Sequence, residues 1–432
     1  MLMKKLITLF ILFMGMVSSV SAWDTVYLND DDNSWGSGSP QPFKMDNSNH
    51  HTYTFNATKL LKIRQSDYFF RFYVSNGGGH FQPTNDRDVI SSTDYKNCIS
   101  GESNAFQILK APNAKSLVID LNYNDSDGDW KWHLTATITN YDNTTKVCYV
   151  DDATAGTSLG AKIYAYAWDP NNDNLRILGN FPGTEMNTNS DGTFYLDGIS
   201  YAEGMKIIFN NKEDGSNGSQ TSDIDLTANS VYNFSGKVEN RPVTVSSYSN
   251  GTFSSIYPLD FTSVDGLTAY RIDGASGGTL STASVGKVPA NTGLYVEGST
   301  AGKEYSVPTT VAAVSVGTNW LKPGTGATVP QTDGVGNTNF ILTTNKGASA
   351  TPKFFKVNTA GNTVAAGKAY LQIPSENVGA HEYFWFEDET TGIETAKASQ
   401  KMNGEFFNLA GQRVAQPTKG LYVVNGKKVI MK

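Results

Sequence analysis

Hydrophobic and polar residues alternate at every second position along much of this 432-residue chain, in short runs that turn residues separate. YFFRFYVS (68–75), SLVIDLNY (116–123) and KIYAYAWDP (162–170) are three such runs. Because successive side chains of a strand point to opposite faces, a period of two predicts β-strands. We find no helical stripe after residue 22, so the pattern predicts an all-β fold.

Polar stretches rich in Asn, Gly and Asp divide the strand-like runs into modules. Asp127-Gly128 and Asn425-Gly426 are dipeptides typical of tight β-hairpin turns. Between residues 146 and 236, seven short runs at this spacing predict a β-sandwich. We therefore expect a string of β-sandwich modules with a small C-terminal β segment. The predicted parts are an N-terminal β-sandwich module (23–143), a second β-sandwich (147–245), a β-rich module (250–386), a linker (387–404) and a C-terminal β segment (405–432).

The first 22 residues, MLMKKLITLFILFMGMVSSVSA, have the pattern of a secretory signal peptide. Two lysines precede a short apolar run, and small residues precede a predicted cut before Trp23. An uncleaved membrane anchor is the alternative. No later run is long and apolar enough to span a bilayer, so we expect a mature protein without a transmembrane segment, secreted or at the cell surface.

Charge and cysteine content narrow the classes of partner. The formal net charge is −7 and no basic stripe is visible, so nucleic acid is not an expected partner. Cys98 and Cys148 are the two cysteines, and both a disulfide between them and two buried free thiols remain open.

A search for catalytic motifs yields nothing local. The chain has no H-E-x-x-H metal motif, no phosphate loop and no dinucleotide fingerprint, and we expect no nucleophile elbow. Most acidic residues lie in turn contexts, where Asp bonds the backbone, and no pair of carboxylates stands out. We expect no catalytic residue, no metal and no cofactor; a site distributed over several strands is the open alternative.

The run KIYAYAWDP raises a question about its two faces. Tyr164, Tyr166 and Trp168 fall on one side of the predicted strand, and Ala165 and Ala167 fall on the other. Alternating aromatics usually pack in a core, and the pattern by itself favours that interpretation. The alternative is a platform for a sugar, because the C–H face of a pyranose packs against an aromatic ring.

Three motifs in order carry a resemblance to a known family. YAYAWD (164–169) is followed by LGNFPGTEM (178–186), then by KIIFNN (206–211) with QTSDIDL (220–226). Over about residues 147–236 this order resembles carbohydrate-binding module family 26, a starch-binding family. The resemblance implies a β-sandwich that binds α-glucan. Phe181 departs from the family, which usually has Trp before the Pro-Gly pair.

The resemblance also implies roles for particular side chains. Stacking on sugar rings is implied for Tyr164, Tyr166 and Phe181, while Trp168 is either a third stacking residue or a core residue. We expect the tyrosines to be the rings that face solvent. The residues implied to bond sugar hydroxyls are Asn210 or Asn211, Lys212 and Gln220.

The remaining modules resemble parts of other exported proteins. The third module contains LDFTSVDGLTAYRI (259–272), VPANTGLYV (288–296) and GKAYLQIP (367–374), and with these runs it resembles a β-rich module common in secreted proteins of Bacteroidetes. The C-terminal segment, with FFNLAGQRV (406–414) and KGLYVVNGKKV (419–429), resembles type IX secretion sorting signals, and sorting, attachment and a simple terminal hairpin remain open. We therefore expect a secreted, non-catalytic starch- or α-glucan-binding protein that works with amylases or glucan transporters at the cell surface. The alternatives are an amylase-like, glycan-active enzyme and a surface adhesin or structural protein.

Overall fold

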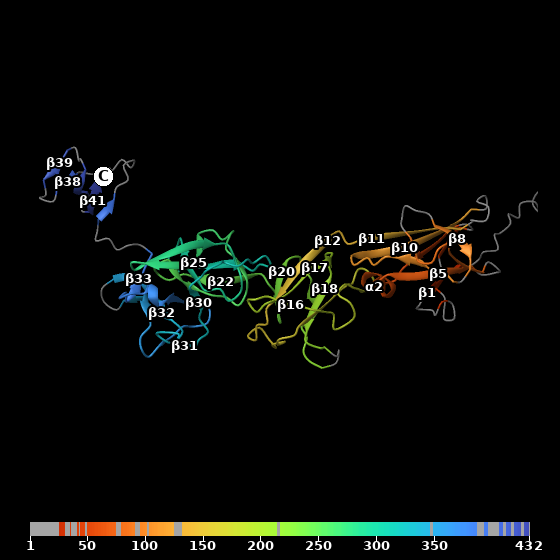
Figure 1. The fold of residues 1–432 in the computed structure, drawn as a ribbon, viewed down its shortest axis with the longest axis horizontal. Coiled ribbons are helices and arrows are strands. Elements are labelled where there is room, and N and C mark those ends of the chain that lie inside the picture. The colour runs from red at the N-terminus through yellow and green to blue at the C-terminus, as the bar shows by residue number, and fades with distance from the viewer. Residues whose placement is uncertain are drawn as a thin grey trace, which may run out of the picture. The chain divides into compact units, whose positions relative to one another are not determined.

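The protein is described from a computed structural model, drawn in Figure 1. Strands account for 52% and helices for 4% of it, which confirms the all-β prediction. The signal peptide and most of the predicted linker lie outside the described residues. Those residues are 26–386, without 31–34, 36–40, 43, 48–49, 75–78, 91–95, 102, 125–131, 214–216 and 346–348, together with 393–395, 406–408, 412–415, 419–424 and 427–431.

The chain forms two compact units. One is Met1–Glu239 with Thr309–Val311, and the other is Asn240–Pro308 with Ala312–Lys432. The first predicted module and the second as far as Glu239 thus belong to one unit, whereas residues 240–245, predicted as the end of the second module, belong to the other unit, where β22 (Asn240–Thr244) pairs with β29 (Glu304–Pro308).

Hydrogen bonds join the strands of the first module into one sheet of eleven, in the order β2-β1-β5-β6-β8-β11-β10-β4-β3, with β9 paired to β5 and β7. In β5 the residues at every second position from Tyr68 to Val74 are buried, as the period of two predicts. β10 and β11 pair with Tyr123 opposite Trp132; Asp127 and Gly128, between them, lie outside the described residues. The strands are β1 (Val26–Asp30), β2 (Gln41–Pro42), β3 (Lys44–Asn47), β4 (His50–Thr54), β5 (Tyr68–Val74), β6 (Gly79–Pro83), β7 (Asp88–Val89), β8 (Lys96–Ser100), β9 (Phe106–Ile108), β10 (Ala114–Tyr123) and β11 (Trp132–Asn140).

A helix, α2 (Ala57–Gln65), lies between β4 and β5 in the sequence, so the expectation of no helix after residue 22 is wrong. The side chain of Asn56 caps the helix by accepting a hydrogen bond from the Lys59 amide at 3.0 Å. The helix escaped the pattern search because two charged residues lie on its buried side: Lys59 is 4% exposed and Arg64 is 7% exposed. Lys59 pairs with buried Asp30, and these polar residues break the apolar stripe that marks most helices.

The second module is a β-sandwich of two five-stranded sheets. One has the order β16-β17-β12-β20-β21, and the other has the order β14-β13-β18-β19 with β15 on β13. Between the sheets, the ring of Phe209 packs against Tyr149 at 4.7 Å and Tyr232 at 5.4 Å between centroids. The strands are β12 (Asn143–Tyr149), β13 (Tyr164–Asp169), β14 (Leu175–Arg176), β15 (Thr184–Glu185), β16 (Asn187–Thr188), β17 (Phe194–Tyr201), β18 (Lys206–Asn210), β19 (Ile224–Asp225), β20 (Ser230–Asn233) and β21 (Gly236–Val238).

The first two modules share one hydrophobic core, which continues from Leu60 and Ile63 of α2 to Leu175 and Ile177 of the sandwich. Figure 1 shows α2 where the two modules meet. Arg64 crosses this junction: its guanidinium donates to the Ala114 carbonyl at 2.9 Å on one side and to Ser200 Oγ at 3.0 Å and the Ile177 carbonyl at 3.4 Å on the other.

A second polar contact crosses the same junction. The Tyr141 hydroxyl donates to the buried carboxylate of Asp169 at 2.8 Å. Burial raises the pKa of Tyr141 to about 12, so the hydroxyl keeps its proton at neutral pH.

The two cysteines do not form a disulfide with each other. Cys98 and Cys148 are both free thiols and both buried, which is the second of the two alternatives left by the sequence.

The second unit contains the third module, whose two larger sheets have the orders β23-β28-β25-β26 and β30-β35-β32-β33-β36. Tyr295, Phe340 and Phe354 lie in their common core. The elements are β22 (Asn240–Thr244), β23 (Asn250–Phe253), β24 (Leu259–Asp260), β25 (Leu267–Ser276), β26 (Thr279–Val285), β27 (Lys287–Val288), β28 (Leu294–Gly298), β29 (Glu304–Pro308), β30 (Leu321–Pro323), β31 (Thr328–Val329), β32 (Asn337–Asn345), β33 (Ser349–Lys356), β34 (Asn362–Thr363), β35 (Ala369–Pro374), the 3-10 helix η2 (Ser375–Asn377) and β36 (Tyr383–Phe384).

The C-terminal segment forms a small sheet in the order β37-β41-β40-β38-β39, and one of its strands, β37, comes from the stretch predicted as a linker. β40 and β41 pair from Val424 opposite Lys427, and the predicted turn Asn425-Gly426 lies outside the described residues. Its strands are β37 (Ile393–Thr395), β38 (Phe406–Phe407), β39 (Arg413–Val414), β40 (Gly420–Val424) and β41 (Lys427–Met431). In the part of the chain that the structure describes, no helix has the length and apolar character needed to cross a bilayer.

Candidate carbohydrate-binding site

Strand β13 turns its aromatic side away from the sandwich core. Ala165 and Ala167 are fully buried in that core, whereas Tyr166 and Trp168 on the opposite face are half-buried. Ala165 pairs with Phe209 of β18, whose large ring fills the space that the small alanine leaves. The core interpretation that the pattern by itself favours is therefore wrong for these rings.

Three rings form a continuous group on this outer face, which we call the ring row: Trp168, Tyr166 and Phe181. Tyr166 is in the middle, with Trp168 at 5.5 Å and an interplanar angle of 34° on one side. Phe181 lies at 5.7 Å and 66° on the other side and is 37% exposed. The row thus presents apolar ring surface in several orientations rather than as one flat strip.

Tyr164 is on the same side of β13 but is only 8% exposed. Lys162 lies over its ring, with Nζ 5.5 Å from the centroid. This lysine also pairs with Glu213 and, at 3.7 Å, with Glu185, and its hydrogen bond with Glu213 raises its pKa. Of the two tyrosines expected to face solvent, the structure exposes Tyr166 but not Tyr164, and Trp168 is the second accessible ring of the strand.

The two predicted asparagines hold loops in place. Asn210 is fully buried, and its Nδ2 donates to the Pro182 carbonyl at 3.0 Å, which fixes the loop that carries Phe181. Asn211 is half-buried and its Nδ2 donates to the Leu159 carbonyl at 2.9 Å. Asn210 therefore supports the ring row from beneath, without access to a ligand.

Gln220 and Lys212 lie at the Tyr164 end of the face. A bridge pairs Gln220 with Asn210, which in turn pairs with Tyr164 across β18 and β13. Gln220 is exposed and Lys212 is half-buried. The structure thus brings Gln220 to the Tyr164 end of the outer face, at the opposite end of β13 from Trp168, and Lys212 is tied to the same end through its backbone amide, which donates to Asn210 Oδ1 at 3.1 Å.

At the Trp168 end the structure adds residues that the sequence did not indicate. A hollow of about 440 Å³ is bounded by Tyr166 and Trp168 on one side and by helix α2 on the other. No sequence signal could identify it, because α2 precedes β13 by a whole module and was itself not predicted. Its other lining residues are Ala57, Thr58, Leu61, Asp173, Asn174 and Arg176.

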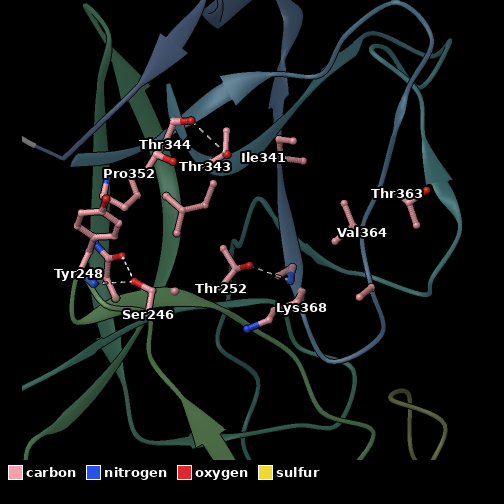
Figure 2. A pocket seen from close by; sticks show the side chains of 15 residues that line it. Ser246, Tyr248, Thr252, Ile341, Thr343, Thr344, Pro352, Thr363, Val364 and Lys368 are labelled. Carbon is pink, nitrogen blue, oxygen red and sulfur yellow. Dashed lines mark hydrogen bonds between the residues drawn. The ribbon is translucent and has the colours of Figure 1, made fainter. Parts of the chain in front are cut away.

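A second hollow, of about 420 Å³, lies within the third module. Figure 2 shows Tyr248, Ser246 and Pro352 on one side of it and Val364 and Thr363 on the other. Tyr248 is 45% exposed. This hollow belongs to the other compact unit, and the motifs that resemble a starch-binding module do not reach it.

The letters G-x-S-x-G occur twice in the sequence, at 156–160 and 274–278, but neither stretch forms a nucleophile elbow. Ser158 lies in the connection between β12 and β13, and its hydroxyl donates to Asp151 at 2.6 Å. Ser276 ends strand β25 next to a hairpin turn. An elbow requires a strand that turns into a helix, so the pattern here is fortuitous. Among the described residues, no group of three or more His, Cys, Asp or Glu is arranged to hold a metal ion.

Comparison with known proteins adds no relative. A scan of the chain against protein-family models finds no match, and a search of curated proteins finds no similar sequence.

Proposed function

We propose that the second module binds starch or a related α-glucan on the ring row, and that the protein is a secreted, non-catalytic glucan-capture protein of the bacterial cell surface. One observation carries the proposal: β13 turns two large rings outward and two alanines inward. A soluble protein that places large rings on its surface, beside a third ring from another loop, loses burial energy unless a partner covers them.

The chemistry of the ring row suits a glucan. Each ring offers a flat apolar surface to the C–H face of a pyranose, while polar groups nearby can bond its hydroxyls. Interplanar angles of 34° and 66° favour a curved chain over a flat one such as cellulose. In this proposal Gln220 and Lys212 bond sugar hydroxyls, and Asn210 holds the loop that carries Phe181. Captured glucan would then be held near amylases or glucan transporters.

The test is retention on insoluble starch. We expect wild-type protein to sediment with starch granules, and Tyr166→Ala to remain in the supernatant because the central ring is lost. Tyr195→Ala is the matched control, since Tyr195 is a half-buried tyrosine on β17 in the opposite sheet of the same sandwich. Gln220→Ala should be retained less than wild type.

Three outcomes would contradict the proposal. The first is no retention of the wild type, and the second is equal retention of wild type and Tyr166→Ala. Release of reducing sugar from soluble starch by the purified protein would instead identify an enzyme.

A further inference from the structure

The hollow at the Trp168 end of the ring row has walls from two modules. Helix α2 of the first module contributes Thr58, and β13 of the second module contributes Trp168. The turn between β13 and β14 contributes Asp173 and Asn174, and β14 contributes Arg176, which pairs with Trp168 across the sheet. The hollow is thus continuous with the ring row at Tyr166 and Trp168.

The turn that borders the hollow is fixed by the first module. The Leu175 amide donates to the Asn172 carbonyl at 2.9 Å, and the two residues between them, Asp173 and Asn174, have φ of 50° and 54°. This is a tight β-turn at the end of the five-residue connection between β13 and β14, and its left-handed backbone conformation is one that Asn and Asp tolerate. The side chain of Asn172 donates to the Lys115 carbonyl of the first module at 2.8 Å.

The helical wall is equally constrained. Arg64, six residues beyond Thr58 on α2, is buried and donates to carbonyls of both modules. Neither wall therefore has to be ordered when a ligand enters, which reduces the entropic cost of binding.

The lining matches a neutral polyhydroxylated ligand. Trp168 and Tyr166 supply ring surface, while the hydroxyl of Thr58, the amide of Asn174 and the charged groups of Asp173 and Arg176 supply both donors and acceptors. One acidic and one basic side chain give no net preference for an anion or a cation. A volume of about 440 Å³ is in the range of small-molecule sites.

We infer that the glucan site is composite: a longer α-glucan continues from the ring row into this hollow, where a sugar stacks on Trp168 against a wall formed by helix α2. This inference rests on the proposed function of the ring row. It adds a subsite to which the first module contributes directly, so the first module takes part in recognition and is more than a spacer.

The test fills the hollow from the side of the first module. Thr58→Trp, at an exposed helix position, places an indole in the space between α2 and Trp168. Lys62→Trp is the matched control: it lies on the same helix, is exposed and does not line the hollow. Binding of maltotriose and maltoheptaose to the full chain is measured by isothermal titration calorimetry, and the unfolding temperature of each variant shows whether it is folded.

We expect Thr58→Trp to weaken maltoheptaose binding at least tenfold and Lys62→Trp to leave it unchanged. Asn174→Gly, which keeps the turn because glycine accepts positive φ, should weaken maltoheptaose binding several-fold by removing one amide. It serves as the second variant if Thr58→Trp does not fold.

The outcomes separate this inference from the function on which it rests. If Tyr166→Ala abolishes binding while Thr58→Trp and Asn174→Gly bind maltoheptaose as wild type does, the composite site is wrong and the glucan-binding function stands. If wild-type protein binds neither oligosaccharide, both are wrong.

Discussion

Replacing Arg64 with methionine tests whether the first two modules are one cooperative structure. Methionine has a similar length and fits an apolar core, so the change removes the guanidinium without opening a large cavity. The guanidinium makes two good hydrogen bonds, at 2.9 and 3.0 Å, and a longer one at 3.4 Å, all to groups in the buried junction. Burial also lowers the pKa of Arg64, which reflects the cost of desolvating its charge.

These contributions set the expected magnitude. Hydrogen bonds to charged groups contribute about 1.5–3 kcal/mol each, and recovered desolvation offsets part of the loss, so we expect the free energy of unfolding to fall by about 3 kcal/mol. For a unit of this size that corresponds to a decrease in Tm of roughly 6–12 °C.

Differential scanning calorimetry of the full chain measures the shift, and hydrogen exchange locates it. Peptides from α2 and from β17 should lose protection together in Arg64→Met, because the guanidinium joins both. Lys62→Met, an exposed change on the same helix, should alter Tm by less than about 2 °C. A decrease in stability below about 1 kcal/mol, or protection lost from one module alone, would refute the reasoning.

Four further predictions concern the ring row, the loop that supports it and the buried thiols. Phe181→Trp enlarges the exposed end of the ring row by roughly 30 Å² of apolar contact, so glucan affinity measured by calorimetry should rise about 3- to 4-fold, and unchanged or weaker binding would contradict stacking at this position. Asn210→Ala leaves the Pro182 carbonyl without its donor; unfolding by urea should become easier by about 1–3 kcal/mol, and glucan binding should weaken as Phe181 loses its position. Burial raises the pKa of Cys148 to about 12, and burial also raises that of Cys98, so a thiol reagent at pH 8 should modify neither until the protein unfolds. In the unfolded chain the Cys148 thiol loses its proton near pH 8.5, whereas in the folded protein it keeps its proton up to about pH 12. The free energy of unfolding should therefore fall by about 1.4 kcal/mol per pH unit between these two values, and Cys148→Val should remove this pH dependence.

Strands β5 and β10 of the first module were predictable because their burial alternates with a period of two. β13 also lies where alternation placed it, but β18 and β20 of the sandwich are buried almost throughout, so there only the short apolar runs and the turns between them indicated strands. The alternation of residue types does not show which face of a strand points into the core. For β13 the answer depends on Phe209, Tyr149 and Tyr232, which fill the core and leave room there only for alanines.

Helix α2 and the hollow beside it could not be predicted for a different physical reason. Lys59 and Arg64 are buried because each has partners that are distant in sequence, Asp30 for the first and Ser200 for the second. No local sequence pattern indicates such distant partners, so the sequence does not distinguish a buried charged residue from an exposed one. The burial of Tyr164 and Asn210 was likewise not predictable: the resemblance implied that both contact the ligand, but other parts of the chain cover them.

The separation of core and surface positions along β13 determines which substitutions this strand can accept. Ala165 and Ala167 belong to the interior, and Tyr166 and Trp168 belong to the surface, so the two sets of positions are nearly independent. Substitutions at 166, 168 and 181 can alter ring size and polarity without disturbing the sandwich interior. The strand is therefore a place where evolution or a designed library of variants can alter the surface chemistry of the module while its interior stays the same.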